Sequence, residues 1–200
     1  MVKRTKILIV GDSATGKSAL IRRLIENKFE LGHQMSFGAS FVPYEFQHED
    51  GTKENIELWD MAGENRQKSL LKVYYSRAKG IMITIDMSER ETFENIQAWV
   101  NRINDFKEEY TNVLLVGTKM DEKLEVSEDE AKEYAESVGY PIIFTSSFTG
   151  SNVREAFTEV LKVKEIPKQV VEQPKKKSIL PIIVVVSLLV LVLGVILYLL

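Results

Sequence analysis

The stretch Gly11 to Ser18, GDSATGKS, constrains the fold more than any other part of this chain. It matches the eight-position phosphate-loop pattern, with two glycines that let the backbone curl and a Lys17–Ser18 pair at its end. An apolar run over residues 6–10 precedes it, and a helical pattern over residues 19–25 follows it. The sequence therefore predicts a strand, a glycine-rich loop and a helix in direct succession, which is the context that separates a phosphate loop from a chance match.

The chemistry expected of this loop is the binding of phosphate and Mg²⁺. Its backbone N–H groups point inward at phosphate oxygens, the Lys17 ammonium reaches the β and γ phosphates, and the Ser18 hydroxyl is a ligand for Mg²⁺. The helix that follows adds the positive end of its dipole. The residues expected to line the phosphates are Ser13, Ala14, Thr15, Gly16, Lys17, Ser18 and Ala19.

The first 165 residues alternate between strand and helix patterns. Four short apolar runs are typical of strands buried on both faces: residues 6–10, 81–85, 113–116 and 142–144. Residues 41–46 alternate in polarity and contain a proline, which predicts an edge strand. We expect an α/β fold of the P-loop type, with a doubly wound, mostly parallel six-stranded sheet and one antiparallel edge strand.

Three apolar stripes at helical spacing lie between these strands, over residues 93–106, 131–138 and 153–161. The second begins with a Ser127–Glu130 capping box and ends at Gly139. All three stripes are interpreted as helix faces packed on the core.

Residues 179–200 carry no charge, and only Ser187 and Tyr198 interrupt their apolar character. As a helix the segment would span roughly 33 Å, which matches a bilayer core of about 30 Å. A buried core helix is the alternative, but it would show polar residues at a helical period. Residues 175–177 are lysines, which keeps the N-terminal domain on the cytosolic side. We expect a domain over 1–165, a linker with a basic run over 166–178 and a transmembrane tail anchor over 179–200.

Two further motifs follow predicted strands. In WDMAG, Asp60 suits a carboxylate that holds Mg²⁺ through water, and Gly63 can offer its N–H to a γ-phosphate. In GTKMD, Asp121 can accept hydrogen bonds from guanine N1–H and the 2-amino group, and the stem of Lys119 can cover the base. Adenine has neither donor, so a buried Asp121 would reject ATP. Either motif alone is more often a turn; their order after a phosphate loop favours nucleotide binding.

From residue 6 to about residue 163 the chain resembles a small GTPase of the Ras superfamily, in its Rab branch. The resemblance is carried by WDMAGENRQKSLLKVYYSRAKG, which includes Tyr74 and Tyr75, and by IDMSERETFENIQAWV. It implies GTP or GDP with Mg²⁺, effector proteins bound through the switch regions, an exchange factor, an activating protein and a monomeric domain. It further assigns Phe29, Ser36, Thr118, Ser146 and Ser147 to the nucleotide site, with Ser36 on the metal and the last two in TSSFTG beside the base.

Several residues depart from the pattern of that family. Ser36 replaces threonine and keeps the hydroxyl, Thr118 replaces the more usual asparagine, and Ser147 with Phe148 replaces an Ala–Lys pair. Glu64 stands where the family usually carries the glutamine that orients the attacking water. An ionised carboxylate can only accept hydrogen bonds.

Glu64 would also face a γ-phosphate. Two like unit charges about 4 Å apart repel by roughly 4 kcal/mol at an effective dielectric constant of about 20. With Lys17, Gly63 and Glu64 as the catalytic set, we expect slow intrinsic hydrolysis of GTP. The alternative is that Glu64 turns to solvent and a partner protein supplies the missing group.

The cellular role expected from these patterns is a guanine-nucleotide switch for vesicle traffic, anchored on the cytosolic face of a secretory or endosomal membrane. The chain has no cysteine, which excludes prenylation as its anchor, and its net charge of −3 does not suggest nucleic-acid binding. A membrane receptor locked with GTP and a membrane-bound P-loop ATPase are the alternatives, and Asp121 disfavours the second.

Overall fold

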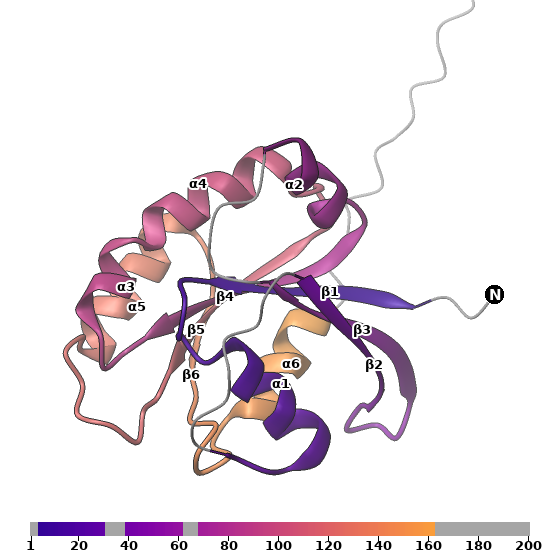
Figure 1. The fold of residues 1–200 in the computed structure, drawn as a ribbon, viewed down its shortest axis with the longest axis horizontal. Helices are drawn as coiled ribbons and strands as arrows, with labels where there is room; N and C mark the ends of the chain where they lie inside the picture. Colours follow the sequence, from indigo (N-terminus) through magenta and orange to yellow (C-terminus); the bar gives the residue numbers. More distant parts are fainter. Residues whose placement is uncertain (1–3, 31–38, 62–67, 163–200) are drawn as a thin grey trace, which may run out of the picture. The chain divides into compact units, whose positions relative to one another are not determined.

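The structure is a computed structural model that describes residues 4–30, 39–61 and 68–162. In these ranges the strands form one six-stranded sheet in the order β2-β3-β1-β4-β5-β6 (Figure 1). Neighbouring strands are parallel except β2 and β3, which pair antiparallel at one edge. The strands are β1 (Thr5–Gly11), β2 (Ala39–Gln47), β3 (Lys53–Met61), β4 (Ala78–Asp86), β5 (Asn112–Thr118) and β6 (Ile142–Phe144).

This architecture confirms the expected α/β fold with a mostly parallel sheet and one antiparallel edge strand. Pro43 lies on β2 opposite Glu57, at the outer edge of the sheet. An edge position suits proline because its missing N–H removes no hydrogen bond from a sheet interior.

Helices cover both faces of the sheet. Figure 1 shows α1 and α6 on one face, and α2, α3, α4 and α5 on the other. The helices are α1 (Lys17–Glu26), α2 (Lys68–Tyr75), α3 (Arg90–Glu94), α4 (Ile96–Phe106), α5 (Glu128–Val138) and α6 (Val153–Leu161).

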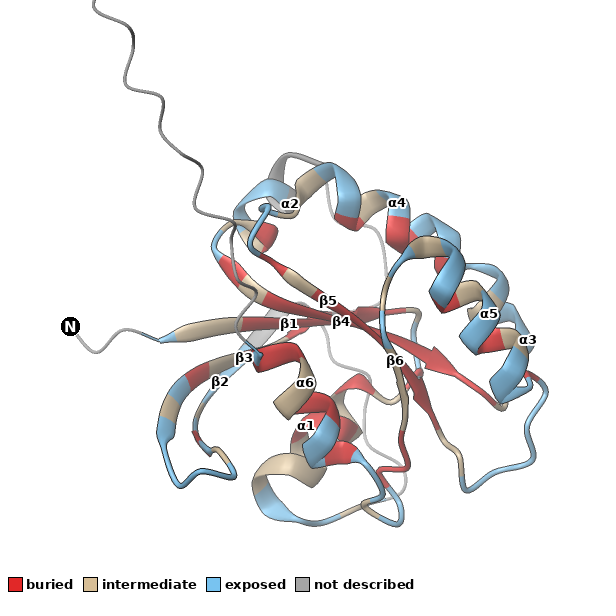
Figure 2. Cartoon of the chain, turned by 180° about the vertical axis from the view of Figure 1, so that it is seen from behind, coloured by how far each residue is buried: buried red, intermediate tan, exposed pale blue. Residues whose placement is uncertain are grey.

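Strand β1 is buried on both faces, which explains its uninterrupted apolar run. Leu8 and Val10 pack into the core beneath α2 to α5, whereas Ile7 and Ile9 pack into the core beneath α1 and α6. All four side chains are fully inaccessible to solvent. Figure 2 shows the same pattern for the central strands, which are buried along most of their length.

The single helix expected over residues 93–106 is divided into α3 and α4 at Asn95. The Asn95 N–H bonds to the carbonyls of Glu91 and Phe93, and its side-chain amide bonds to Asp12. The apolar stripe continues through this junction, so the periodicity of the sequence contained no sign of it.

Helix α5 begins at its predicted cap. The Ser127 hydroxyl accepts a hydrogen bond from the Glu130 N–H at 3.2 Å, and Gly139 ends the helix in the left-handed conformation. The Glu130 carboxylate does not complete the predicted box, because it pairs with Arg90 at 2.6 Å.

Among the residues that the structure describes, no helix is both long and apolar enough to cross a membrane. The predicted linker at 166–178 and the predicted anchor at 179–200 lie outside the described residues.

Candidate nucleotide site

The phosphate loop connects β1 to α1, and its two glycines occupy positions that other residues would not tolerate well. Gly11 has φ of 141°, and a Cβ there would lie 2.4 Å from Thr84 Oγ1 and 2.5 Å from the Thr84 carbonyl oxygen. Gly16 has φ of 85° and caps α1. Ala14 adopts φ of 61°, a left-handed conformation uncommon outside glycine. The backbone thus makes the tight curl that the motif predicts.

Lys17 lies at the start of α1 with its side chain folded back over the loop. Its Nζ donates to the carbonyl oxygens of Gly11 at 3.1 Å and Asp12 at 2.5 Å. Burial lowers the pKa of the Lys17 ammonium, and the nearby carboxylates of Asp60 and Asp12 partly offset this effect. A buried cation that is only partly compensated is well suited to bind an anion.

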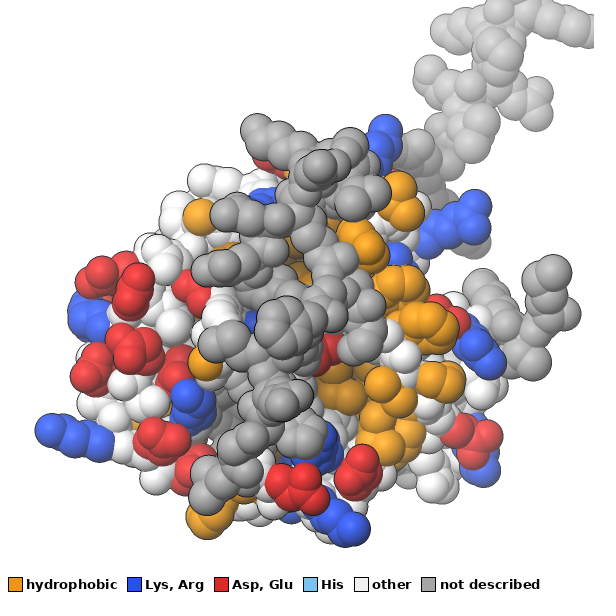
Figure 3. Space-filling view, in the orientation of Figure 1, with side chains coloured by type: hydrophobic (Ala, Val, Ile, Leu, Met, Phe, Trp, Pro, Cys, Tyr) orange, Lys and Arg blue, Asp and Glu red, His pale blue; other side chains and the backbone are white. Residues whose placement is uncertain are grey.

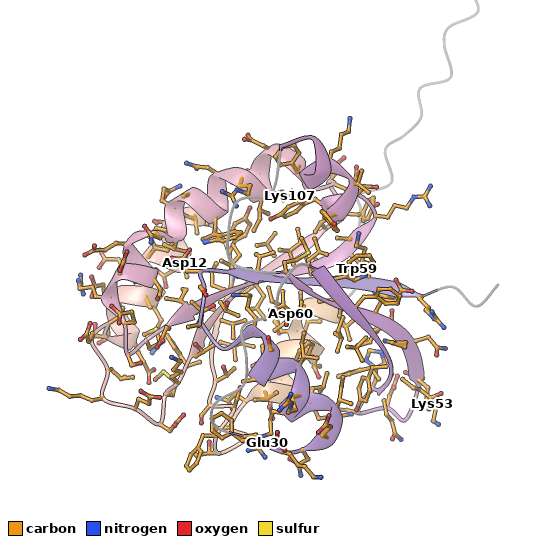
Figure 4. All side chains as sticks on the ribbon, in the orientation of Figure 1. Asp12, Glu30, Lys53, Trp59, Asp60 and Lys107 are labelled. Carbon is orange, nitrogen blue, oxygen red and sulfur yellow. The ribbon has the colours of Figure 1, made fainter. Side chains whose placement is uncertain are left out.

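The Ser18 hydroxyl and the Asp60 carboxylate meet although they come from different elements. Ser18 Oγ donates to Asp60 Oδ2 at 2.5 Å. Asp60, which is labelled in Figure 4, is buried. Asp60 lies near the carboxyl end of β3, beside β1. A hydroxyl and a carboxylate are hard oxygen ligands of the kind that Mg²⁺ prefers, so the two residues fit the predicted metal role.

The described residues contain no cluster of three or more His, Cys, Asp or Glu side chains that could hold a metal ion. A magnesium ion at Ser18 and Asp60 would therefore depend on phosphate and water oxygens as well, which is how Mg²⁺ commonly binds. The three other residues predicted to act at this end, Ser36, Gly63 and Glu64, lie outside the described residues.

The segment after β5 carries the predicted base-binding residues. Thr118 is buried, and its hydroxyl lies 2.9 Å from the Thr15 carbonyl and 3.0 Å from the Ile85 carbonyl. Because it can donate its proton to either oxygen, it ties the phosphate loop to β4. The threonine that replaces the usual asparagine thus helps to hold the phosphate loop against the sheet.

Lys119 has φ of 59°, and its ammonium forms an ion pair with the buried carboxylate of Asp86. Asp121 Oδ1 accepts a hydrogen bond from Ser146 Oγ at 2.5 Å, which connects two of the predicted base-binding residues. Asp121 itself is exposed in the described structure. Asp121 therefore lies on the surface of the loop, and only a bound base would shield its carboxylate from water.

The loop at residues 145–150 is fastened to α1 by Arg23. Arg23 Nε donates to the Ser147 carbonyl at 2.6 Å, and Nη2 donates to the Phe148 carbonyl at 2.5 Å. Nη1 donates to the Asn27 carbonyl at 3.0 Å. Phe29 meets Phe148 edge to face, with ring centroids 5.4 Å apart, and the Phe148 ring is 57% exposed.

Arg23 was not predicted, because its partners in this loop lie more than 120 residues away and no local pattern relates them. It holds the carbonyls of the loop on the side of α1. Ser147 is mostly buried and Ser146 almost completely so.

A further feature that the sequence did not predict is a patch of aromatic side chains on β2, β3 and α2. We define this aromatic patch as Phe41, Trp59 and Tyr74. Phe41 stacks on Trp59 with centroids 5.2 Å apart, and Trp59 meets Tyr74 edge to face at 6.1 Å. Phe41 is 52% exposed, and Val73 beside Tyr74 is also exposed. Figure 3 shows hydrophobic side chains gathered over β2 and β3. Apolar surface of this kind is typical of protein-binding sites.

The predicted residues of the site are joined by contacts along one edge of the sheet. Ser18 reaches Asp60, Thr118 reaches Thr15, and Asp121 reaches Ser146. In parallel α/β sheets, ligands bind at the carboxyl ends of the strands, where this edge lies. A glycine-rich loop and helix at this position define a P-loop nucleotide-binding protein.

Comparison with known proteins narrows that class. Residues 6–166 match the Ras family. The rat Ras-related protein Rab-15 is 32% identical over 160 residues, which cover 79% of this chain and 75% of that protein. RABD2c of Arabidopsis thaliana is 35% identical over 154 residues, 76% of each chain, and Rab-1D of Dictyostelium discoideum is 34% identical over 178 residues, 87% and 86%.

The chain belongs to the Ras family. It is a Rab-like small GTPase, and the members of this family are GTP hydrolases that bind GTP and GDP, generally with Mg²⁺. This membership confirms the resemblance seen in the sequence.

Proposed function

We propose that this protein is a tail-anchored, Rab-type guanine-nucleotide switch that acts in vesicle traffic on the cytosolic face of an endomembrane and hydrolyses GTP slowly. The observation that carries the nucleotide part is a set of contacts between predicted site residues: Ser18 with Asp60, Thr118 with Thr15 of the phosphate loop, and Ser146 with Asp121. The uncharged, mostly apolar segment at 179–200 supports the anchor, and Glu64 supports slow hydrolysis.

In the proposed mechanism the backbone N–H groups of the loop and the Lys17 ammonium hold the β and γ phosphates. Bound Mg²⁺ neutralises phosphate charge; the chain would hold it through the hydroxyls of Ser18 and Ser36 and, through water, the Asp60 carboxylate. The Gly63 N–H binds the γ-phosphate. Selectivity for guanine comes from Asp121, whose two oxygens accept from the two donors that distinguish guanine from adenine.

Effector proteins would bind across the aromatic patch of Phe41, Trp59 and Tyr74. Strand β2 supplies an exposed ring and α2 an exposed neighbour, Val73, so the patch offers apolar contact area to a partner protein. An exchange factor and an activating protein would complete the cycle, as in other proteins of this type.

Glu64 is the residue that sets the proposed rate of hydrolysis. A carboxylate cannot donate a hydrogen bond to the attacking water or to the transferring phosphoryl group, and it repels the γ-phosphate. Glu64→Gln restores the donor, so single-turnover hydrolysis should accelerate at least about tenfold, equivalent to about 1.4 kcal/mol of barrier. Affinity for GTP should change little, because the donor acts mainly in the transition state.

Glu64→Ala is the matched control, since it removes the charge without restoring a donor, and it should remain slower than Glu64→Gln. Equal rates for the parent protein and Glu64→Gln would contradict the proposed role of Glu64. A receptor that stays loaded with GTP is the second candidate function, favoured by the same residue. It predicts no measurable turnover in the parent protein even with an activating protein present.

The anchor is tested separately from the switch. A spanning helix holds a protein far more firmly than a lipid chain, so the full-length protein should resist carbonate extraction whether GTP or GDP is bound. Truncation after Ser178 should release it completely. Partition of the GDP-loaded, full-length protein into the soluble fraction would contradict a permanent anchor.

A further inference from the structure

Asp12 places a carboxylate inside the phosphate loop, two positions beyond the end of the apolar run of β1. A negative charge at this point would repel the phosphates of a nucleotide, because like charges a few ångströms apart interact strongly in a partly buried site. The loop therefore needs a way to keep this carboxylate turned away from its ligand.

Two neutral donors from the α3–α4 junction hold the Asp12 carboxylate. Trp99 Nε1 donates to Asp12 Oδ1 at 2.8 Å, and Asn95 Nδ2 donates to Asp12 Oδ2 at 2.9 Å. Each carboxylate oxygen thus has its own partner. The Trp99 ring is 8% exposed and lies beneath the Arg102 guanidinium at 4.7 Å, so the indole has little freedom to move.

The division of the helix at Asn95 brings one of these donors to the loop. Asn95 lies between α3 and α4, where its side chain turns toward Asp12. Trp99 follows one turn later on α4, on the same face. The junction that periodicity did not predict therefore has a specific contact partner.

The backbone of Asp12 links the position of this residue to the position of Lys17. The Asp12 carbonyl oxygen accepts from Lys17 Nζ at 2.5 Å and from the Thr15 hydroxyl at 2.9 Å. A displacement of Asp12 would therefore move its own carboxylate. It would also move the Lys17 ammonium, the group that meets the nucleotide phosphates.

We propose that Asn95 and Trp99 are positioning residues for the nucleotide site: they hold the Asp12 carboxylate away from the phosphates and so keep Lys17 in place. This inference rests on the proposed function of the loop as a nucleotide site. It also makes α4 a route by which contacts outside the site alter nucleotide binding, because the donors to the loop lie on that helix and at its start.

The test is release of ribose-labelled fluorescent GDP from the full-length protein in Mg²⁺. Trp99→Phe keeps most of the buried ring but lacks the donor, so release should be about tenfold faster, in line with the usual value of a hydrogen bond to a charged group. Adding Asp12→Asn to this variant should restore release to within about twofold of the parent, because an amide does not repel phosphate.

Asn95→Ala removes the second donor from an exposed position and should show a smaller acceleration with the same rescue by Asp12→Asn. Asn104→Ala is the matched control, because it removes another side-chain amide of α4, bonded to the Tyr140 hydroxyl at 2.5 Å, and should leave release unchanged.

Rescue distinguishes a positioning role from a structural one, since a merely destabilised α4 would not recover when residue 12 is changed. Unchanged release in both Trp99→Phe and Asn95→Ala, or acceleration that Asp12→Asn does not reverse, would overturn the inference while leaving the nucleotide site intact. Failure of the parent protein to bind labelled GDP would instead overturn the proposed function, and this inference with it.

Discussion

The base end and the phosphate end of the nucleotide site are stabilised in different ways. At the base end, Arg23 fastens the carbonyls of Ser147 and Phe148 to α1. These contacts join protein groups to one another and can remain when a base binds. At the phosphate end, Lys17 bonds to carbonyls of its own loop and Ser18 bonds to Asp60, through the very atoms that phosphate and Mg²⁺ would use.

The two ends should therefore control different properties of the nucleotide site. The base end is organised by the fold, so changes there should alter selectivity and nucleotide release. The phosphate end exchanges protein contacts for ligand contacts, so changes there should alter affinity, nucleotide release and turnover at little cost to the fold. Three substitutions test this division.

The largest effect is expected at Lys17. Lys17→Met keeps the stem but removes the charge, so affinity for GTP should fall about 100-fold or more. Because burial lowers the pKa of Lys17 in the folded protein, its charge does not favour folding at neutral pH. The nucleotide-free variant should therefore melt no lower than the parent in a calorimetric scan.

Lys53→Met is the matched control, because Lys53 is exposed and its ion pair with Glu45 lies on the surface. A Lys17→Met protein that melts well below its parent, or that retains its affinity for GTP, would remove the contrast between the two ends.

The next effect concerns the identity of the base. Asp121→Asn replaces a double acceptor by a group that also donates, so preference should move from guanine to xanthine nucleotides by at least about 100-fold. The hydrogen bond from Ser146 survives, because the amide oxygen still accepts, and the loop should keep its shape. Competition binding with GTP, XTP and ATP measures the shift.

Asp129→Asn is the control, since that carboxylate is 99% exposed on α5. Unchanged selectivity for guanine in Asp121→Asn would exclude Asp121 from the base site. Because Asp121 is exposed in the described structure, this outcome would also indicate that the pocket is built by other residues.

The smallest effect is expected at Phe148, where the Ras family commonly has lysine. Phe148→Lys removes the edge-to-face contact with Phe29. Such contacts contribute about 0.5–1.5 kcal/mol beyond burial, so GDP release should be roughly two- to tenfold faster with turnover unaffected. Phe148→Tyr keeps the ring and should release GDP at the parent rate, and a change in single-turnover hydrolysis would contradict the assignment of Phe148 to the base end.

The parts of the fold that sequence predicts well are those encoded by neighbouring residues. Strands buried on both faces show as apolar runs, and the phosphate loop and the Asp60 and Asp121 motifs show as local patterns that precede or follow them. The capping box at Ser127 is also a local pattern. Its prediction was correct for the Ser127 hydroxyl and wrong for the Glu130 carboxylate, which pairs with Arg90.

The parts that were missed depend on contacts between distant residues. Arg23 bonds to Ser147 and Phe148, more than 120 residues away, and Trp99 bonds to Asp12 at a separation of 87 residues. The break at Asn95 involves a partner outside the helix, and the exposure of Asp121 depends on how its loop packs. Residue types in a motif identify the chemistry, but not the supports that position it.

The central claim is that this protein holds a guanine nucleotide with Mg²⁺ and turns it over slowly, and the most direct test is to identify the nucleotide that copurifies with the full-length protein. Denaturation followed by chromatography should release GTP and GDP, with GTP persisting because Glu64 slows its hydrolysis. Recovery of adenine nucleotides, or of no nucleotide from protein that also fails to bind added GTP and GDP, would contradict the account.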